Sequence, residues 1–128
     1  MSVQLNHHFV RSREQKREAA FLTDILGLTP STKLSHFDVV ELGNGVSLDF
    51  HTDPDNVKRQ HYAFLVSEAE FDGVFQRIKD RSLTYWADPA RRKEGEINRH
   101  DSGRGMYFES PDGHLLEVLT RPYGSGGA

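Results

Sequence analysis

Apolar and polar residues alternate along some segments of the chain and recur at three-to-four spacing along others. Residues 3–10 alternate as a strand, and apolar residues at helical spacing between Ala19 and Leu26 predict a helix. We expect Ser12 to cap this helix and Gly27 to end it. A connection over residues 30–35 follows. Two strands over residues 36–42 and 46–51 then form a hairpin that completes the first half.

The same order of patterns recurs in the second half. A strand over residues 60–66 leads into a helix from Ser67 to about Asp80, and Glu70 is placed to complete a capping box. Proline, aspartate and glycine at 111–113 supply the tight turn of a closing hairpin. After the helix come a short strand over residues 83–87 and a long irregular loop over residues 88–102. The two strands of the closing hairpin lie within residues 105–119.

The repeated order predicts an α+β fold of two tandem βαβββ modules. Each half places a histidine early in its first strand, at His7 and His61. Each half also places a carboxylate four residues after the hairpin glycine, at Asp49 and Glu117. We expect one domain over residues 1–124. It contains a first module over residues 1–56 and a second over residues 57–122, and residues 123–128 form a flexible tail.

Composition narrows the classes of function. At 128 residues the chain can bury a core as one domain. A net charge of −3 argues against nucleic acid as the main partner. The sequence contains no apolar run long enough for a membrane span and no signal-peptide pattern, so we expect a cytoplasmic protein without a membrane partner. Because cysteine is absent, any metal ion must be held by nitrogen and oxygen.

One carboxylate stands out chemically. Glu117 lies among four aliphatic residues of a strand, and a charge buried there needs a metal ion, a cation or solvent as its partner. Together with His7 and His61 it would form a facial set of two imidazoles and one carboxylate, which suits several divalent ions. Taken alone, a histidine in a strand is more often a hydrogen-bonded core residue, and a glutamate in an aliphatic strand can simply face solvent at an edge; the repeated placement in both halves favours a site.

The chain resembles the vicinal oxygen chelate superfamily, which includes glyoxalase I, fosfomycin resistance proteins, extradiol dioxygenases and bleomycin resistance proteins. The resemblance spans residues 3–121 and is closest in motif to the fosfomycin-resistance members. The segments that carry it are an opening strand and helix, a second opening strand and the closing hairpin: Leu5–His7 with Asp24–Gly27, His61–Phe64, and Tyr107–Glu117. It implies a curved mixed sheet that forms an open half-barrel, in a homodimer whose chains exchange modules.

Carried over to this sequence, the resemblance implies one divalent metal ion per site, held by His7, His61 and Glu117. His8 is the competing candidate in the first strand. The ion could be Fe, Mn, Ni, Co or Zn, and Asp49 could be a fourth ligand or a substrate-facing group. Tyr107 matches a tyrosine that faces substrate, and its phenol could act catalytically.

Further residues are expected to bind substrate. They are Phe9, Asp49, Asn98, Arg99 and Arg104. The pattern of the fosfomycin enzymes is incomplete, because Glu96 stands where a lysine would hold the phosphonate and Phe9 where a threonine would face it.

The resemblance, together with the three candidate ligands, implies a metal-dependent enzyme that acts on a small oxygen-chelating substrate as a lyase, an isomerase, or a catalyst of thiol or water addition. An extradiol-type dioxygenase and a metal-free protein that sequesters a drug are the alternatives.

Overall fold

The computed structural model describes residues 2–126. The chain divides between Lys58 and Arg59 into two compact units. Within the described residues, no helix combines the length and the apolar character needed to cross a bilayer.

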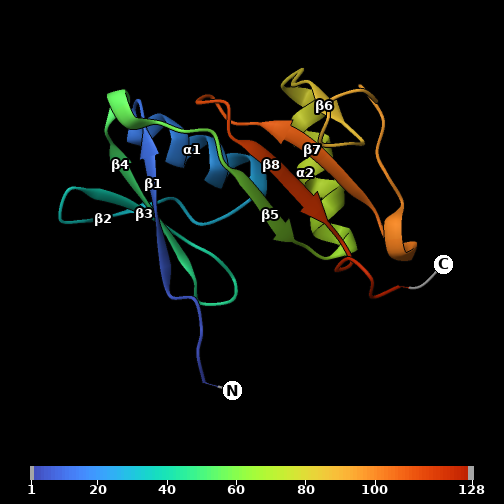
Figure 1. Cartoon of the computed structure of the whole chain (residues 1–128), viewed down its shortest axis with the longest axis horizontal. Helices are drawn as coiled ribbons and strands as arrows, with labels where there is room; N and C mark the ends of the chain where they lie inside the picture. Colours follow the sequence, from blue (N-terminus) through green and yellow to red (C-terminus); the bar gives the residue numbers. More distant parts are fainter. Residues whose placement is uncertain (1, 127–128) are drawn as a thin grey trace. The chain divides into compact units, whose positions relative to one another are not determined.

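The first unit is a βαβββ module (Figure 1). Its strands form a mixed sheet in the order β1-β4-β3-β2, in which β1 and β4 are parallel and the other neighbours are antiparallel. Its elements are β1 (His7–Ser12), α1 (Gln15–Leu26), β2 (Thr32–Leu34), β3 (Phe37–Glu41), β4 (Ser47–Thr52) and the short 3-10 helix η1 (Pro54–Asn56).

The second unit repeats this module. Its sheet has the order β5-β8-β7-β6, again with a parallel pair, β5 and β8, and antiparallel neighbours. The elements are β5 (His61–Leu65), α2 (Glu68–Asp80), β6 (Tyr85–Trp86), the 3-10 helix η2 (His100–Ser102), β7 (Gly105–Glu109) and β8 (Leu115–Leu119). The tandem βαβββ fold with open mixed sheets is therefore confirmed.

Each sheet has one face covered by the helix of its own unit. In the first unit, α1 contacts β1, β3 and β4, and its side chains Ala19, Leu22 and Ile25 are buried. In the second, α2 lies along one face of the sheet (Figure 1) and buries Phe71, Val74 and Ile78. The strand residues on the opposite face of each sheet are therefore not covered by the helix of their own unit.

The two helices begin differently. Ser67 caps α2, and its hydroxyl accepts a hydrogen bond from the backbone of Glu70 while the Glu70 carboxylate accepts one from the backbone of Ser67, so the predicted capping box is confirmed. The prediction that Ser12 caps α1 is wrong. Ser12 ends β1, and Glu14 occupies the N-cap position without a side-chain cap hydrogen bond. Gly27 ends α1 in the left-handed conformation, with φ 69°, as expected.

Several boundaries also differ from the sequence prediction. The first strand begins at His7, and Val3 before it is exposed. The predicted connection over residues 30–35 contains strand β2, which pairs with β3. Strand β6 is only two residues long, and the irregular loop after it contains η2. The predicted tail is described through Gly126, and residues 127–128 lie outside the described part of the chain.

Candidate metal centre

Three predicted site residues lie on one face of the second sheet. Strand pairing sets Glu117 on β8 opposite Tyr107 on β7, and opposite Ala63 on β5. His61 precedes Ala63 by two residues, so it shares this face. Met106 and Phe108 on β7 point to the opposite face and are fully buried. The alternation of the strands therefore separates the core of the unit from its site-bearing face.

Glu117 and His61 are in direct contact. The Nε2 atom of His61 lies 3.0 Å from Oε1 of Glu117. The carboxylate is almost fully buried, at 2% exposure, whereas 46% of the histidine side chain is exposed. The expectation that a carboxylate among aliphatic residues needs a partner is met here by an imidazole. Imidazole nitrogen and carboxylate oxygen are donors that suit divalent ions, so the pair fits a metal site.

Two phenols extend this pair into a hydrogen-bonded chain. The hydroxyl of Tyr123 donates to Oε2 of Glu117. The hydroxyl of Tyr107 lies 2.9 Å from that of Tyr123. Because each phenol has one proton and that of Tyr123 points to the carboxylate, Tyr107 is the donor to Tyr123.

Both phenols are held in their neutral form. Burial raises the pKa of Tyr107, and the nearby charge of Glu117 raises it further. Burial also raises the pKa of Tyr123, to which the hydrogen bond to Glu117 adds. At neutral pH both hydroxyls therefore keep their protons and act as hydrogen-bond donors, Tyr123 to Glu117 and Tyr107 to Tyr123.

Tyr123 was missed by the sequence prediction. It follows β8 in a glycine-rich segment that the sequence assigns to a flexible tail. Its contact with Glu117 depends on how the chain turns back after the strand. The only sequence signal is an aromatic residue in an otherwise small and polar segment.

In the first unit, His7, Phe9 and Asp49 lie on the face opposite the buried core residues of β1 and β4. The Nδ1 atom of His7 lies 2.7 Å from the side-chain oxygen of Asn6. Asp49 is 8% exposed and accepts a hydrogen bond of 2.9 Å from the hydroxyl of Ser47. Phe9 is 53% exposed. This face of the first unit therefore carries the imidazole of His7, the carboxylate of Asp49 and the exposed ring of Phe9.

An aromatic group on the first unit was not foreseen. The ring of Phe9 lies 4.9 Å from that of Phe37, which in turn lies 4.1 Å from His36. His51 on β4 completes the group, with its ring 5.1 Å from His36. Neither His36 nor His51 was among the residues that the sequence predicted to form a site.

The remaining predicted residues have contacts within the second unit. Asn98 donates to the backbone oxygen of Ala87 at 2.9 Å, and its own backbone pairs with Gly105. Arg104 binds α2 through Glu68 and Asp72, at 2.8 Å and 2.9 Å. Its guanidinium also lies 4.4 Å from the centre of the ring of Phe71, so it is on the helix side of the sheet.

Arg99 is exposed and precedes η2. The structure therefore brings His61, Tyr107 and Glu117 together and does not bring Arg104 to them.

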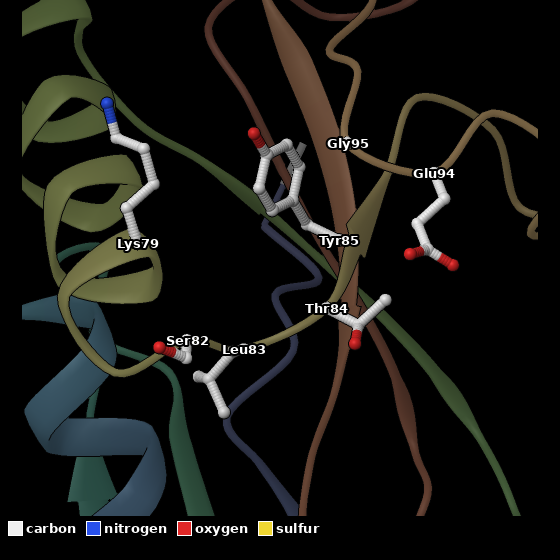
Figure 2. A pocket seen from close by; sticks show the side chains of 7 residues that line it. All are labelled: Lys79, Ser82, Leu83, Thr84, Tyr85, Glu94 and Gly95. Carbon is white, nitrogen blue, oxygen red and sulfur yellow. The ribbon is translucent and has the colours of Figure 1, made fainter.

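A separate hollow of about 300 Å³ lies at the end of α2 (Figure 2). Figure 2 shows Lys79 projecting from the helix on one side of Tyr85 and Glu94 on the other. The ammonium group of Lys79 lies 4.3 Å from the centre of the ring of Phe75. None of the predicted metal ligands lines this hollow.

Comparisons with known proteins identify the family of the chain. The family model described as Glyoxalase/Bleomycin resistance protein/Dioxygenase superfamily matches residues 4–118. A glutathione transferase, FosA of Serratia marcescens, is 28% identical over 120 residues, which cover 89% of this chain and 78% of the relative.

Two solved structures are much more similar. Oxidase ChaP-H2 is 57% identical, with a TM-score of 0.95, and the match covers 99% of this chain and all of that one. Oxidase ChaP-H1 is 52% identical, with a TM-score of 0.94, and the match covers 96% of this chain and 99% of that one. The chain therefore belongs to the Glyoxalase/Bleomycin resistance protein/Dioxygenase superfamily.

Proposed function

We propose that this protein is a divalent-metal-dependent enzyme that uses dioxygen as the oxidant to oxidise a small molecule bound through two neighbouring oxygen atoms. The observation that carries the proposal is the buried carboxylate of Glu117 in contact with the imidazole of His61, 3.0 Å away, on the open face of the second sheet. In the proposed site His61 and Glu117 are two ligands and His7 is the third. One ion would be bound per site, with Fe, Mn, Ni, Co and Zn as candidates.

The bound ion would act as a Lewis acid that polarises the substrate oxygens. The protein residues have separate tasks. Glu117 supplies the negative charge that offsets part of the charge of the ion, and the surrounding aliphatic strand excludes water from it. Tyr107 remains protonated and could donate a hydrogen bond to a substrate oxygen as negative charge develops there.

Oxidation is proposed because two proteins more than 50% identical to this chain over almost its whole length are named oxidases. The exposed ring of Phe9 beside Phe37 supports a ring-bearing substrate, since aromatic side chains stack against flat rings. The substrate class that fits both features is an aromatic compound with adjacent hydroxyl or carbonyl oxygens.

Thiol addition is the second candidate. It is favoured by the 28% identity to a glutathione transferase over most of the chain. Glu96 stands in the region where those enzymes hold a phosphonate, and a carboxylate would repel that group. Asn98 and Arg104, which were expected to bind substrate, make contacts within the second unit instead. We therefore place oxidation first.

Reconstitution separates these functions. Tag-free protein would be stripped of metal, loaded in turn with each of the five candidate ions, and supplied with a catechol or an ortho-hydroxyketone. Oxygen uptake that depends on the ion would support oxidation. In a second assay the loaded protein would be supplied with glutathione and an epoxide, and loss of the thiol as the epoxide ring opens, without oxygen uptake, would support thiol addition. Failure to retain any ion would instead favour the metal-free binding protein.

The matched control for this experiment is Glu109→Gln. Glu109 is a carboxylate on β7 in the same unit, and it pairs with Arg59 and Arg91. The variant should retain metal and activity, whereas Glu117→Gln should lose both.

We also propose that the protein is a homodimer whose chains exchange modules, so that His7 of one chain completes the site of the other. The exposed side chains of Phe9 and Leu65 on the site-bearing faces support the need for a partner. Mixing His7→Ala chains with Glu117→Ala chains tests the arrangement. In an exchanged dimer one of the two sites would regain all its ligands, so activity should return on mixing. A mixture as inactive as its components would contradict it.

A further inference from the structure

The segment that follows β8 places a hydroxyl on the carboxylate of the proposed metal centre. Tyr123 donates a hydrogen bond to Oε2 of Glu117, and His61 lies 3.0 Å from Oε1. Both oxygens of the carboxylate are therefore engaged by side chains of the same unit. These are also the atoms that a metal ion would take.

The segment is fixed at two further points. The backbone nitrogen of Ser125 lies 3.1 Å from the oxygen of Pro122, which closes a turn around Tyr123. Beyond this turn, the backbone nitrogen of Gly126 lies 3.4 Å from the carboxylate of Asp101 in η2. A Cβ atom at Gly126 would lie 1.6 Å from the backbone oxygen of Asp101, so only glycine fits this approach. The segment thus lies back over its own unit as a short strap, residues 122–126.

Tyr123 is held mainly by its hydroxyl. The residue is 60% exposed, whereas Glu117 beneath it is 2% exposed. Little apolar surface would be lost to the protein if the ring moved away, and the carboxylate would then be open from one side. The contact is therefore well suited to be made and released.

We propose that Tyr123 is a gate on the metal centre, which satisfies Glu117 in the metal-free protein and withdraws from it when the ion binds. The inference rests on the proposed function, because it assigns the ion to Glu117. A buried carboxylate without a hydrogen-bond partner destabilises a protein, so the strap stabilises the empty site. For the same reason it competes with the ion, since the hydrogen bond has to break before Oε2 can bind metal.

The first test compares affinities for zinc, measured by calorimetry on the metal-free chain of 128 residues. Tyr123→Phe retains the ring and removes the competing hydroxyl, so we expect it to bind zinc about tenfold more tightly, or about 1.4 kcal/mol. Tyr85→Phe is the control, because Tyr85 is a phenol of the same unit that lines the hollow in Figure 2 and contacts Phe75. It should leave the affinity within about twofold of the wild type.

The results separate the gate from the proposed function. Equal affinity of the wild type and Tyr123→Phe would overturn the gate and leave the metal centre standing. Weaker binding by Tyr123→Phe would also overturn it, since the hydroxyl would then support the bound ion. If neither protein binds zinc or any of the other four ions, the metal centre itself is wrong and the gate falls with it.

The second test follows the strap directly. Chymotrypsin cuts after tyrosine, so cleavage between Tyr123 and Gly124 reports release of the ring and is measured by the mass of the product that lacks residues 124–128. Saturating zinc should accelerate this cut in the wild type at least fivefold. Gly126→Ala should accelerate it without zinc, because the added Cβ cannot fit beside Asp101. A peptide substrate in the same tube corrects for any effect of zinc on the protease.

Glu117→Gln is a further variant in this assay, because it weakens the acceptor for Tyr123 and keeps the shape of the side chain. It should be cut faster than the wild type when both lack metal. Cleavage that zinc leaves unchanged or slows in the wild type would overturn the gate.

Discussion

The two units share one fold and one strand register, yet they differ at the positions where a site can form. In the first unit, β1 pairs with β4 so that Phe9 lies opposite Asp49. In the second, β5 pairs with β8 so that Ala63 lies opposite Glu117. In each unit the residue that pairs with the carboxylate follows a histidine of the same strand by two residues: Phe9 follows His7, and Ala63 follows His61. The repeated scaffold places the two carboxylates equivalently.

Their surroundings then diverge. Glu117 lies 3.0 Å from the imidazole of His61, whereas Asp49 accepts a hydrogen bond from Ser47. Tyr107 lies opposite Glu117 in the strand pairing, and Val39 occupies the equivalent place opposite Asp49. The longer side chain and the phenol beside it occur only in the second unit. The fold therefore offers two equivalent places, and side-chain length with local hydrogen bonding decides which one holds the imidazole–carboxylate pair.

Removal of each carboxylate should break this comparison most clearly. Loss of an outer partner of a metal ligand lowers metal affinity by about 10- to 100-fold, so loss of a ligand should exceed that range. We therefore expect Glu117→Ala to weaken zinc binding more than about 100-fold and Asp49→Ala to weaken it less than about 10-fold. Calorimetry on both variants checks this. Equal losses would instead make Asp49 a ligand of the same standing.

Tyr107 should affect turnover rather than metal affinity. A positioned proton donor contributes about 100- to 10,000-fold to a rate, so Tyr107→Phe should lower kcat by at least about 100-fold. Val39→Ala, at the equivalent place in the first unit, should leave kcat within about threefold of the wild type. Steady-state kinetics with metal-loaded protein provides the measurement. A kcat that Tyr107→Phe leaves unchanged would remove the phenol from the chemistry.

The two helix starts offer a smaller contrast, in stability. Ser67 caps α2, and its replacement by alanine should lower the free energy of unfolding by about 1 kcal/mol. Glu14 gives α1 no side-chain cap, so Glu14→Ser should raise the free energy of unfolding by up to about 1 kcal/mol. Urea unfolding of the metal-free protein measures both. A loss of stability in Glu14→Ser would show that the carboxylate there has another role.

The smallest expected effect is a change of folding stability with pH, caused by Glu70 at the start of α2. The backbone hydrogen bond from Ser67, and then the one from its side chain, lower the pKa of Glu70. The resulting stabilisation is present above the unfolded pKa of glutamate, about 4.3, and is lost as the pH falls through the lower folded value. Glu70→Gln should therefore flatten the stability profile below about pH 5. An unchanged profile would contradict this assignment.

The sequence predicted the parts of this molecule that depend on local pattern. The tandem βαβββ order followed from alternation and helical spacing, and the capping box from Ser67 and Glu70. The need of Glu117 for a partner followed from its four aliphatic neighbours, because a lone buried charge is unfavourable. Strand β2 was missed because three residues are too few to show alternation, and its place is set by pairing with β3.

Contacts between distant residues could not be predicted in this way. Tyr123 meets Glu117 only because the chain turns back after β8. Arg104 binds Glu68, which lies 36 residues away, because α2 packs on the sheet beside it. No periodicity marks either contact, since both depend on how elements pack rather than on how they form. The contact that suggests a gate is therefore one that only the structure reveals.

The central claim is that a single metal ion binds the carboxylate and imidazole of the second unit. Anomalous diffraction at the zinc absorption edge, from crystals of zinc-loaded tag-free protein, tests it most directly. The account predicts one peak per chain at about 2 Å from Nε2 of His61 and from a carboxylate oxygen of Glu117, with Tyr123 moved away from that oxygen. A peak elsewhere, or none in protein that retains zinc in solution, would contradict it.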